Sequence, residues 1–334
     1  MNIASLCERL CGRDGITGRE ASLDLREELA SFGAVRQTPV GSLICEVPGE
    51  GAPILLDAHA DRIGLIVTEI TPEGFLRFDK VGGMDRRVLC ASAVTVRGRR
   101  DVPGVITSVP PHLMKDGDGD KAPQFDELFV DVGMTQEEAR AVISVGDAVT
   151  VDGSPRFLSD SRLTGAALDD RAGVAALLGT LDILRENGCG RAVTVMLSAQ
   201  EETGGPGAGT GAFAVQPAEA IAVDVSFAVQ DGVAPHQAGK LGAGPMICFS
   251  PSLSREMSRR LVNTAERNGI PYQLEVASGS TGTNADDIAG SGCGVVTGLV
   301  SIPQRNMHTQ AELVDVEDVK AVALLLAAYI MGED

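Results

Sequence analysis

The chain has 334 residues, which is more than one hydrophobic core usually supports, so we expect two domains. Its 44% hydrophobic and 22% charged residues are typical of a globular protein and exclude a disordered, collagen-like or coiled-coil chain. The net charge of −18 would repel phosphate backbones and anionic lipid surfaces, so we expect neither a nucleic-acid nor a membrane partner.

The sequence predicts neither a targeting segment nor a disulfide framework. The first residues lack the basic and apolar segments of a signal peptide, and the longest apolar run, 321–331, is too short to span a bilayer. The seven cysteines are scattered, odd in number and without a CxxC pair, as is typical of buried thiols in a reducing compartment. We therefore predict a cytoplasmic protein.

Hydrophobic spacing predicts an α/β protein. A capping box at 17–20, followed by apolar residues at roughly helical spacing, predicts a helix that ends at Gly33. Strands are predicted next, and the wholly apolar one at 54–57 is typical of a buried sheet. Beyond residue 155 helices and strands alternate, which predicts a largely parallel sheet with helices on both faces. The predicted strands are 43–47, 54–57, 193–197, 220–225, 273–276 and 294–302, and the later helices are 169–187, 253–269 and 315–331.

Residues 66–155 have a different pattern of predicted secondary structure, because short β-rich segments alternate with turns that contain Gly, Pro and Asp. We predict an inserted β domain here, so that 1–65 and 156–334 together form the catalytic α/β domain. The run 115–121 is predicted to be a solvated loop. Lys121 stands where an EF-hand loop requires glycine, which argues against a calcium site.

Metal-type ligands follow several predicted strands or lie in the adjoining turns. Ligands of open α/β sheets bind beyond the carboxyl ends of the strands. Two histidines and three carboxylates could hold two divalent ions, each with one His, one terminal carboxylate and one shared Asp. With a bridging hydroxide, these carboxylates would offset the charge of both ions and lower the cost of burial. The five residues are His59, Asp169, Glu202, Asp224 and His308.

Glu201 precedes a predicted ligand and could face the water between the ions as the general acid/base. Taken alone, an acid such as Asp169 would more often cap a helix, and His59 would more often be a buried histidine with a satisfied hydrogen bond. Caps have no reason to occur together with two histidines at strand ends. The joint pattern therefore favours a metal centre.

In this order, these segments resemble the cocatalytic metallo-aminopeptidases of the tetrahedral (TET), glutamyl aminopeptidase-like family. The resemblance covers nearly the whole chain. It rests on the segments 59–64, 167–173, 200–204, 221–225, 281–286 and 302–308.

The resemblance implies a phosphorylase/hydrolase-like catalytic domain, with a mixed sheet between helices, and a small inserted PDZ-like β domain. It assigns one ion to His59, Asp169 and Asp224, and the other to Asp169, Glu202 and His308. Asp169 is then the bridge and Glu201 the general acid/base. Asp61 would orient the His59 ring, and Asp170 would support the bridge. The implied cofactors are two zinc or cobalt ions, and the implied assembly is a dodecamer that forms through the inserted domain and admits short peptides.

Four positions depart from the family pattern, but none of them is a predicted ligand. We expect these changes to affect specificity rather than metal binding, with the last three hinting at a polar wall near the substrate. His112 is expected to have a structural or interface role, and His236 is a candidate for lining the active site. The four departures are Pro206, Asn284, Gln304 and Asn306.

We predict a metallo-aminopeptidase that removes the N-terminal residue of short peptides through a metal-bridged hydroxide. Two alternatives stay open. One is a two-metal amidohydrolase that acts on N-acyl amino acids, which would need a pocket for a carboxylate rather than a free amine. The other is a catalytically inactive scaffold of the same fold, for which Glu201→Gln would change nothing.

Overall fold

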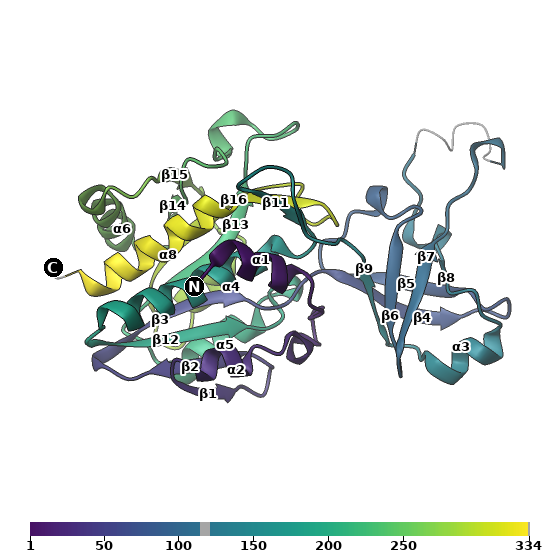
Figure 1. Cartoon of the computed structure of the whole chain (residues 1–334), viewed down its shortest axis with the longest axis horizontal. Helices are drawn as coiled ribbons and strands as arrows, with labels where there is room; N and C mark the ends of the chain where they lie inside the picture. The colour runs from purple at the N-terminus through teal and green to yellow at the C-terminus, as the bar shows by residue number, and fades with distance from the viewer. Residues whose placement is uncertain (114–120, 333–334) are drawn as a thin grey trace.

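The computed structural model describes residues 1–113 and 121–332, which form an α/β part and a small barrel (Figure 1). The loop predicted at 115–121 lies, apart from Lys121, outside the described residues. None of the helices in the described ranges has the length and apolarity needed to cross a membrane.

A mixed sheet of 11 strands forms the centre of the α/β part. Its strands are β1 (Ala34–Gln37), β2 (Leu43–Val47), β3 (Glu50–His59), β10 (Arg156–Phe157), β11 (Arg162–Gly165), β12 (Arg191–Ser198), β13 (Glu219–Phe227), β14 (Met246–Phe249), β15 (Gln273–Val276), β16 (Val296–Arg305) and β17 (Glu312–Asp315). The order is β1-β2-β12-β3-β13-β16-β17-β11-β10, with β14 and β15 beside β16. The central strands β12, β3, β13 and β16 are parallel, whereas the antiparallel pairs β1–β2 and β10–β11 lie at the two ends of the order.

Helices cover both faces of the sheet, so the central strands are buried on both sides. Leu56 and Val223 belong to the core under one face, and their neighbours Leu55 and Ala222 belong to the core under the other. This explains why β3 is apolar without alternation. The helices that pack together on the first face are α1 (Ile3–Cys11), α4 (Leu168–Asn187) and α8 (Val316–Met331). The second face is covered by α5 (Pro206–Val215) and α7 (Asn284–Ala289). Two further helices pack nearby: α2 (Arg26–Ala30) on β1, and α6 (Arg255–Asn268) on β14, β16 and α8.

Residues 64–151 include a closed six-stranded barrel with its own apolar core, at one end of the molecule in Figure 1. Leu65, Val96 and Val149 are fully buried in this core. The α-helix α3 (Gln136–Val142) belongs to this part and is capped by Thr135, whose side chain accepts a hydrogen bond from the Glu138 N–H. The strands are β4 (Gly64–Ile70), β5 (Leu76–Val81), β6 (Ala93–Arg97), β7 (Asp101–Ile106), β8 (Val130–Asp131) and β9 (Ala148–Val151).

Most predicted elements are present with small shifts at their ends. The strands over 43–47 and 273–276 have the predicted bounds, and α8 is capped by Asp315, whose carboxylate accepts from the Glu317 N–H at 2.9 Å. The sheet is more mixed than the alternation of helices and strands predicted, because its edges are antiparallel. Several elements were not predicted, among them α1, α5, α7, β1 and β14.

The helix predicted from the capping box at 17–20 is wrong. The chain instead forms a 3-10 turn, η1 (Glu20–Leu23), then a left-handed residue, Asp24, with φ 53°, and then the short α2. Glu20 does not cap a continuous helix. Its carboxylate accepts hydrogen bonds from the N–H groups of Gly18 and Gln200 at 2.9 and 3.1 Å, so it connects this segment to the loop after β12.

Candidate metal centre

The five predicted ligands meet at the carboxyl end of the central parallel strands. His59 ends β3, Asp224 lies in β13, and Glu202 follows β12 in the 3-10 turn η6 (Glu201–Thr203). Asp169 lies at the start of α4, and His308 lies in the turn between β16 and β17. Parallel strands bring their carboxyl ends to one edge of the sheet, which gathers residues that are up to about 250 positions apart in the sequence.

Asp169 lies between the two histidines. Its Oδ1 is 2.9 Å from Nε2 of His59, and its Oδ2 is 3.3 Å from Nε2 of His308. Each oxygen of one carboxylate therefore faces a different imidazole. This is the arrangement needed by a carboxylate that bridges two cations.

A second carboxylate accompanies each histidine. Asp224 Oδ1 is 3.9 Å from Nε2 of His59, and Glu202 Oε2 is 3.4 Å from Nε2 of His308. These contacts pair Asp224 with His59 and Glu202 with His308, and both histidines contact Asp169. The ligand atoms of His59, Asp169 and Glu202 also lie within 4.8 Å of one another, so the cluster is continuous rather than divided into two separate groups. Their role as ligands is taken up under the proposed function.

The His59 ring is oriented for coordination through Nε2. Its Nδ1 lies 3.1 Å from the backbone carbonyl of Asp61, which can only accept a hydrogen bond, so Nδ1 carries a hydrogen. In the neutral ring, the Nε2 lone pair then points at carboxylates that also carry negative charge. Such a contact requires a cation between the two groups, either a proton or a metal ion.

The electrostatics of the cluster show a shortage of positive charge. Burial raises the pKa of Asp224 well above its usual range, and burial together with the charge of Asp169 raises the pKa of Glu202 to about 9. Burial opposes protonation of His308, but its hydrogen bond to Asp169 and the charge of Glu202 outweigh burial and raise the pKa of His308 to about 9. Without another cation, these groups retain protons that metal ions could replace.

Asp170 lies closer to one set than the sequence indicated. It is fully buried, and its Oδ1 accepts a hydrogen bond from the Gly173 N–H at 2.9 Å at the start of α4. One oxygen of Asp170 also lies within 4.8 Å of ligand atoms of His59 and Asp224. Asp169 remains the better candidate for the bridge, because it alone of this pair contacts both imidazoles at 3.3 Å or less.

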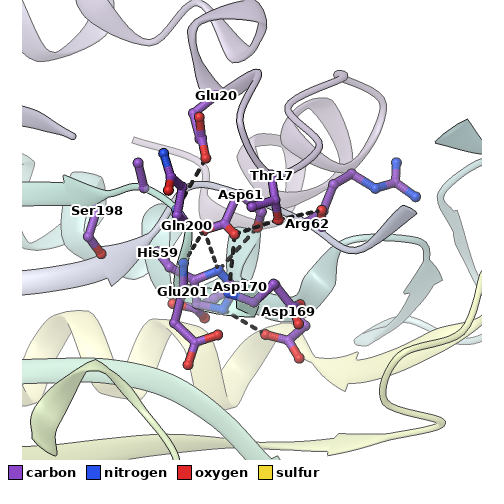
Figure 2. Close-up of polar contacts among 12 residues, drawn as sticks. Thr17, Glu20, His59, Asp61, Arg62, Asp169, Asp170, Ser198, Gln200 and Glu201 are labelled. Atoms are coloured by element: carbon purple, nitrogen blue, oxygen red, sulfur yellow. Dashed lines mark hydrogen bonds and ion pairs between the residues drawn. The ribbon is translucent and has the colours of Figure 1, made fainter. Parts of the chain in front are cut away.

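Asp61 organises the loop that carries the two glutamates. Its Oδ1 accepts from the Glu201 N–H at 3.0 Å, and its Oδ2 accepts from the Thr17 hydroxyl at 2.8 Å (Figure 2). Its Oδ2 also accepts from the Glu202 N–H at 3.2 Å. The Asp61 carboxylate is 3.5 Å from Nδ1 of His59, farther than its own backbone carbonyl. The carboxylate therefore connects Thr17 with the backbone of Glu201 and Glu202 more closely than it contacts the His59 ring.

The Glu201 side chain points from η6 toward the cluster and takes part in none of the contacts drawn in Figure 2. Burial is the main cause that raises the pKa of this carboxyl, and the charge of Asp169 adds to it. A carboxyl group with a raised pKa beside a metal centre is suited to accept and return a proton.

Glu312 is a residue of the site that the sequence did not reveal. This side chain on β17 is 1% exposed. Its Oε2 accepts from the Asp169 N–H and its Oε1 from the His308 N–H, both at 3.1 Å. Its position four residues after His308 is the only sequence signal, and the contact with Asp169 depends on the tertiary fold.

The predicted polar wall is only partly supported. Gln304 is fully buried and donates to Glu312 at 3.4 Å, and Asn284 is 3% exposed and donates to Asp57 at 2.9 Å. Both side chains are engaged within the core, so of the three residues only Asn306 is exposed. His112 and His236 are exposed in the 3-10 turns η3 (Pro111–Leu113) and η7 (Pro235–Gln237).

A mixed α/β sheet that gathers two histidines and several carboxylates around Asp169, with Glu201 beside them, is an arrangement that metal-dependent hydrolases use. Over residues 41–325 the sequence matches the M42 glutamyl aminopeptidase family, and the chain belongs to that family. It is therefore a metal-dependent aminopeptidase, a hydrolase of peptides.

Relatives with similar sequences or structures cover almost the entire chain. A lysyl aminopeptidase of Pyrococcus furiosus is 31% identical over 97% of this chain and 96% of its own. The structure of an aminopeptidase from Desulfurococcus kamchatkensis has a TM-score of 0.91 and 34% identity, and covers 99% of this chain and 95% of its own. The TET1 peptidase of Pyrococcus horikoshii, described as assembling into a tetrahedron or a large octahedral shell, has a TM-score of 0.87 and 32% identity, with 98% of both chains covered.

Proposed function

We propose that the chain removes the N-terminal residue from short peptides, using two divalent ions held by the two sets that share Asp169. The observation that carries this proposal is the position of Asp169, with one carboxylate oxygen toward each imidazole. Three carboxylates and two neutral imidazoles form a donor set that accepts zinc or cobalt. When bound, such ions polarise a substrate carbonyl and lower the pKa of water.

The residues of the chain supply the remaining chemistry. Glu201 accepts the proton of the attacking water and returns it to the leaving amine, which keeps the proton count balanced over one turnover. Asp61 positions Glu201 through its backbone N–H and so fixes the distance between this base and the cluster. The Glu312 carboxylate holds the backbones of Asp169 and His308 by accepting a hydrogen bond from the N–H of each.

We also propose that the barrel joins copies of this chain in a homo-oligomer. The tetrahedral assembly described for the archaeal relative supports this, since the rotational symmetry of a tetrahedron generates a dodecamer from equivalent subunits. We propose further that the barrel is a PDZ-like domain inserted into the catalytic domain. The inserted domain would comprise residues 66–155, and the catalytic domain residues 1–65 and 156–334. A cytoplasmic location is supported by seven free cysteines.

The experiment compares aminoacyl p-nitroanilides with N-acetyl amino acids as substrates for the zinc- or cobalt-loaded protein. We expect hydrolysis of the anilides, and a large loss of that activity in Glu201→Gln. Glu186→Gln, a change at an exposed glutamate of α4, is the control and should remain fully active. Turnover of the acylated substrates alone would favour the amidohydrolase. If Glu201→Gln matched the wild type, with neither substrate set turned over, the chain would be an inactive scaffold.

A further inference from the structure

Two glycines of the barrel part reach the metal centre. Gly82 and Gly83 directly follow β5. A Cβ atom at Gly83 would lie 2.4 Å from Nδ1 and 2.7 Å from Cε1 of His308, far inside contact distance. A Cβ atom at Gly82 would lie 2.7 Å from Cγ2 of Ile63, and 3.2 Å from Cβ and 3.3 Å from Oε2 of Glu202. The backbone of this segment therefore packs against both His308 and Glu202.

The turn that carries His308 has an unusual backbone and a contact with the barrel part. His308 and Asn306 have φ values of 61° and 55°, in the left-handed region that residues with a side chain adopt less readily than glycine. The next segment of the barrel part provides a second contact: Gln310 Nε2 donates to the carbonyl of Val88 at 3.2 Å and lies 3.4 Å from the Ser92 hydroxyl. Residues 82–92 thus contact the turn at two points.

The other set of the centre is held differently. His59 and Asp224 lie on adjacent parallel strands, in which Asp57 pairs with Ala222 two residues earlier. Both side chains are at least nine-tenths buried, whereas the side chain of His308 is 31% exposed. The sheet therefore positions His59 and Asp224 of the first set, whereas His308 and Glu202 of the second set lie on a turn and on a short 3-10 segment outside the strands.

We propose that the Gly82–Gly83 segment is a positioning element for His308 and Glu202, so that one of the two ions depends on the barrel part and the other does not. This inference rests on the two-ion centre of the proposed function. The approach to His308 requires glycine at position 83, whereas a side chain at Gly82 would clash first with Ile63 and press less closely on Glu202. The contacts of Gln310 add to this approach. Neither glycine touches substrate in this account, since the segment acts through the two side chains that it packs against.

The test measures metal stoichiometry and affinity by titration calorimetry of the ion-free full-length protein with zinc. Gly83→Ala should bind one ion as the wild type does and the other about 10- to 100-fold more weakly, which is the usual cost of disturbing a ligand's support. His308→Ala is the reference and should weaken the same ion. Excess zinc should restore the activity of Gly83→Ala, which a general folding defect would not allow.

The chain offers matched controls for the backbone change itself. Gly51 has the same φ of 77° as Gly82, but a Cβ there would have no described atom within 4 Å. Gly190 is the matched control for Gly83, because neither glycine has a φ in the left-handed region. A Cβ at Gly190 would have no described atom within 4 Å. Gly51→Ala and Gly190→Ala should bind both ions normally.

Gln310→Ala removes the second contact without adding an atom, so it keeps the test valid if the alanine variants of Gly82 and Gly83 fail to fold. It should weaken the same ion by a smaller factor. If the wild type binds two ions, and Gly83→Ala and Gln310→Ala bind both with wild-type affinity, the inference is overturned and the proposed function stands. A wild type that binds a single ion overturns the proposed function, and this inference with it.

Discussion

Strand β13 carries one buried carboxylate near each end, and the two have opposite surroundings. At the amino end, Glu219 accepts from Arg191 at 2.6 Å and from Arg260 at 2.7 Å. Burial opposes its ionisation, but these hydrogen bonds outweigh burial and lower its pKa. At the carboxyl end, Asp224 lies among other acids with His59 as the nearest basic group, at 3.9 Å, and burial raises its pKa.

The difference shows which buried acid stabilises the fold and which is suited to function. A charge that is buried for structural reasons is supplied with fixed cations by the same chain. The acids at the carboxyl end have no arginine partner of this kind. The positive charge that offsets them must therefore come from bound protons or metal ions. The predictions below test this contrast.

The largest expected effect follows removal of the ions. Treatment with a chelator should abolish aminoacyl-anilide hydrolysis, and added zinc or cobalt should restore it, because the carboxyl-end cluster has no other source of Lewis acidity. Activity and bound metal are measured together, by anilide hydrolysis and elemental analysis. Full activity in a preparation free of metal would show that the acids at the carboxyl end do not need metal ions for function.

The next effect compares the same substitution at the two ends of the sheet. Glu201→Gln should lower kcat by about 10²- to 10⁴-fold, because it removes the proton acceptor while both ions stay bound. Glu219→Gln should leave kcat unchanged, since it lies at the opposite end of the strands. Steady-state kinetics and metal analysis of both variants check this, and an equal loss of kcat in the two would contradict it.

Metal binding should release protons. In the ion-free chain, the pKa values of Glu202 and of His308 are both raised to about 9, so the interacting pair retains bound protons at neutral pH. Coordination requires their deprotonated forms, so zinc affinity should rise with pH and level off above the raised pKa values. Calorimetry in buffers with different ionisation enthalpies counts the protons, and His308→Ala should release fewer. Affinity that does not change with pH would argue against these two groups as ligands.

The smallest effect concerns stability at the amino end. Because the pKa of Glu219 is lowered in the folded state, its stabilising contribution is present above the unfolded pKa and is lost as pH falls through the folded value. Glu219→Gln should therefore reduce the free energy of unfolding at pH 7 by about 1–3 kcal/mol, and the difference should shrink in acid. Urea unfolding of wild type and variant across pH measures it; a difference that grows in acid would have the wrong sign.

The sequence predicted the parts of the site that depend on strand ends. The clustering of His59, Asp169, Glu202, Asp224 and His308 could be predicted, because residues that follow buried strands converge at one edge of a parallel sheet. Glu312 could not, because its two hydrogen bonds join segments 143 and four residues away.

The other misses have the same cause. The sequence carries no local sign of the approach of Gly82 and Gly83 to Glu202 and His308, since this approach exists only once the barrel part is placed against the α/β part. The predicted helix from the capping box at 17–20 failed because Glu20 bonds to Gln200, 180 residues away, instead of capping locally. Local patterns indicated the elements, and tertiary hydrogen bonds decided these exceptions.

The most direct measurement is the anomalous scattering of crystals grown with zinc. The account predicts two peaks about 3.5–4 Å apart, with Asp169 between them, His59 and Asp224 at one and Glu202 and His308 at the other. A single peak, or zinc bound away from these side chains, would contradict it.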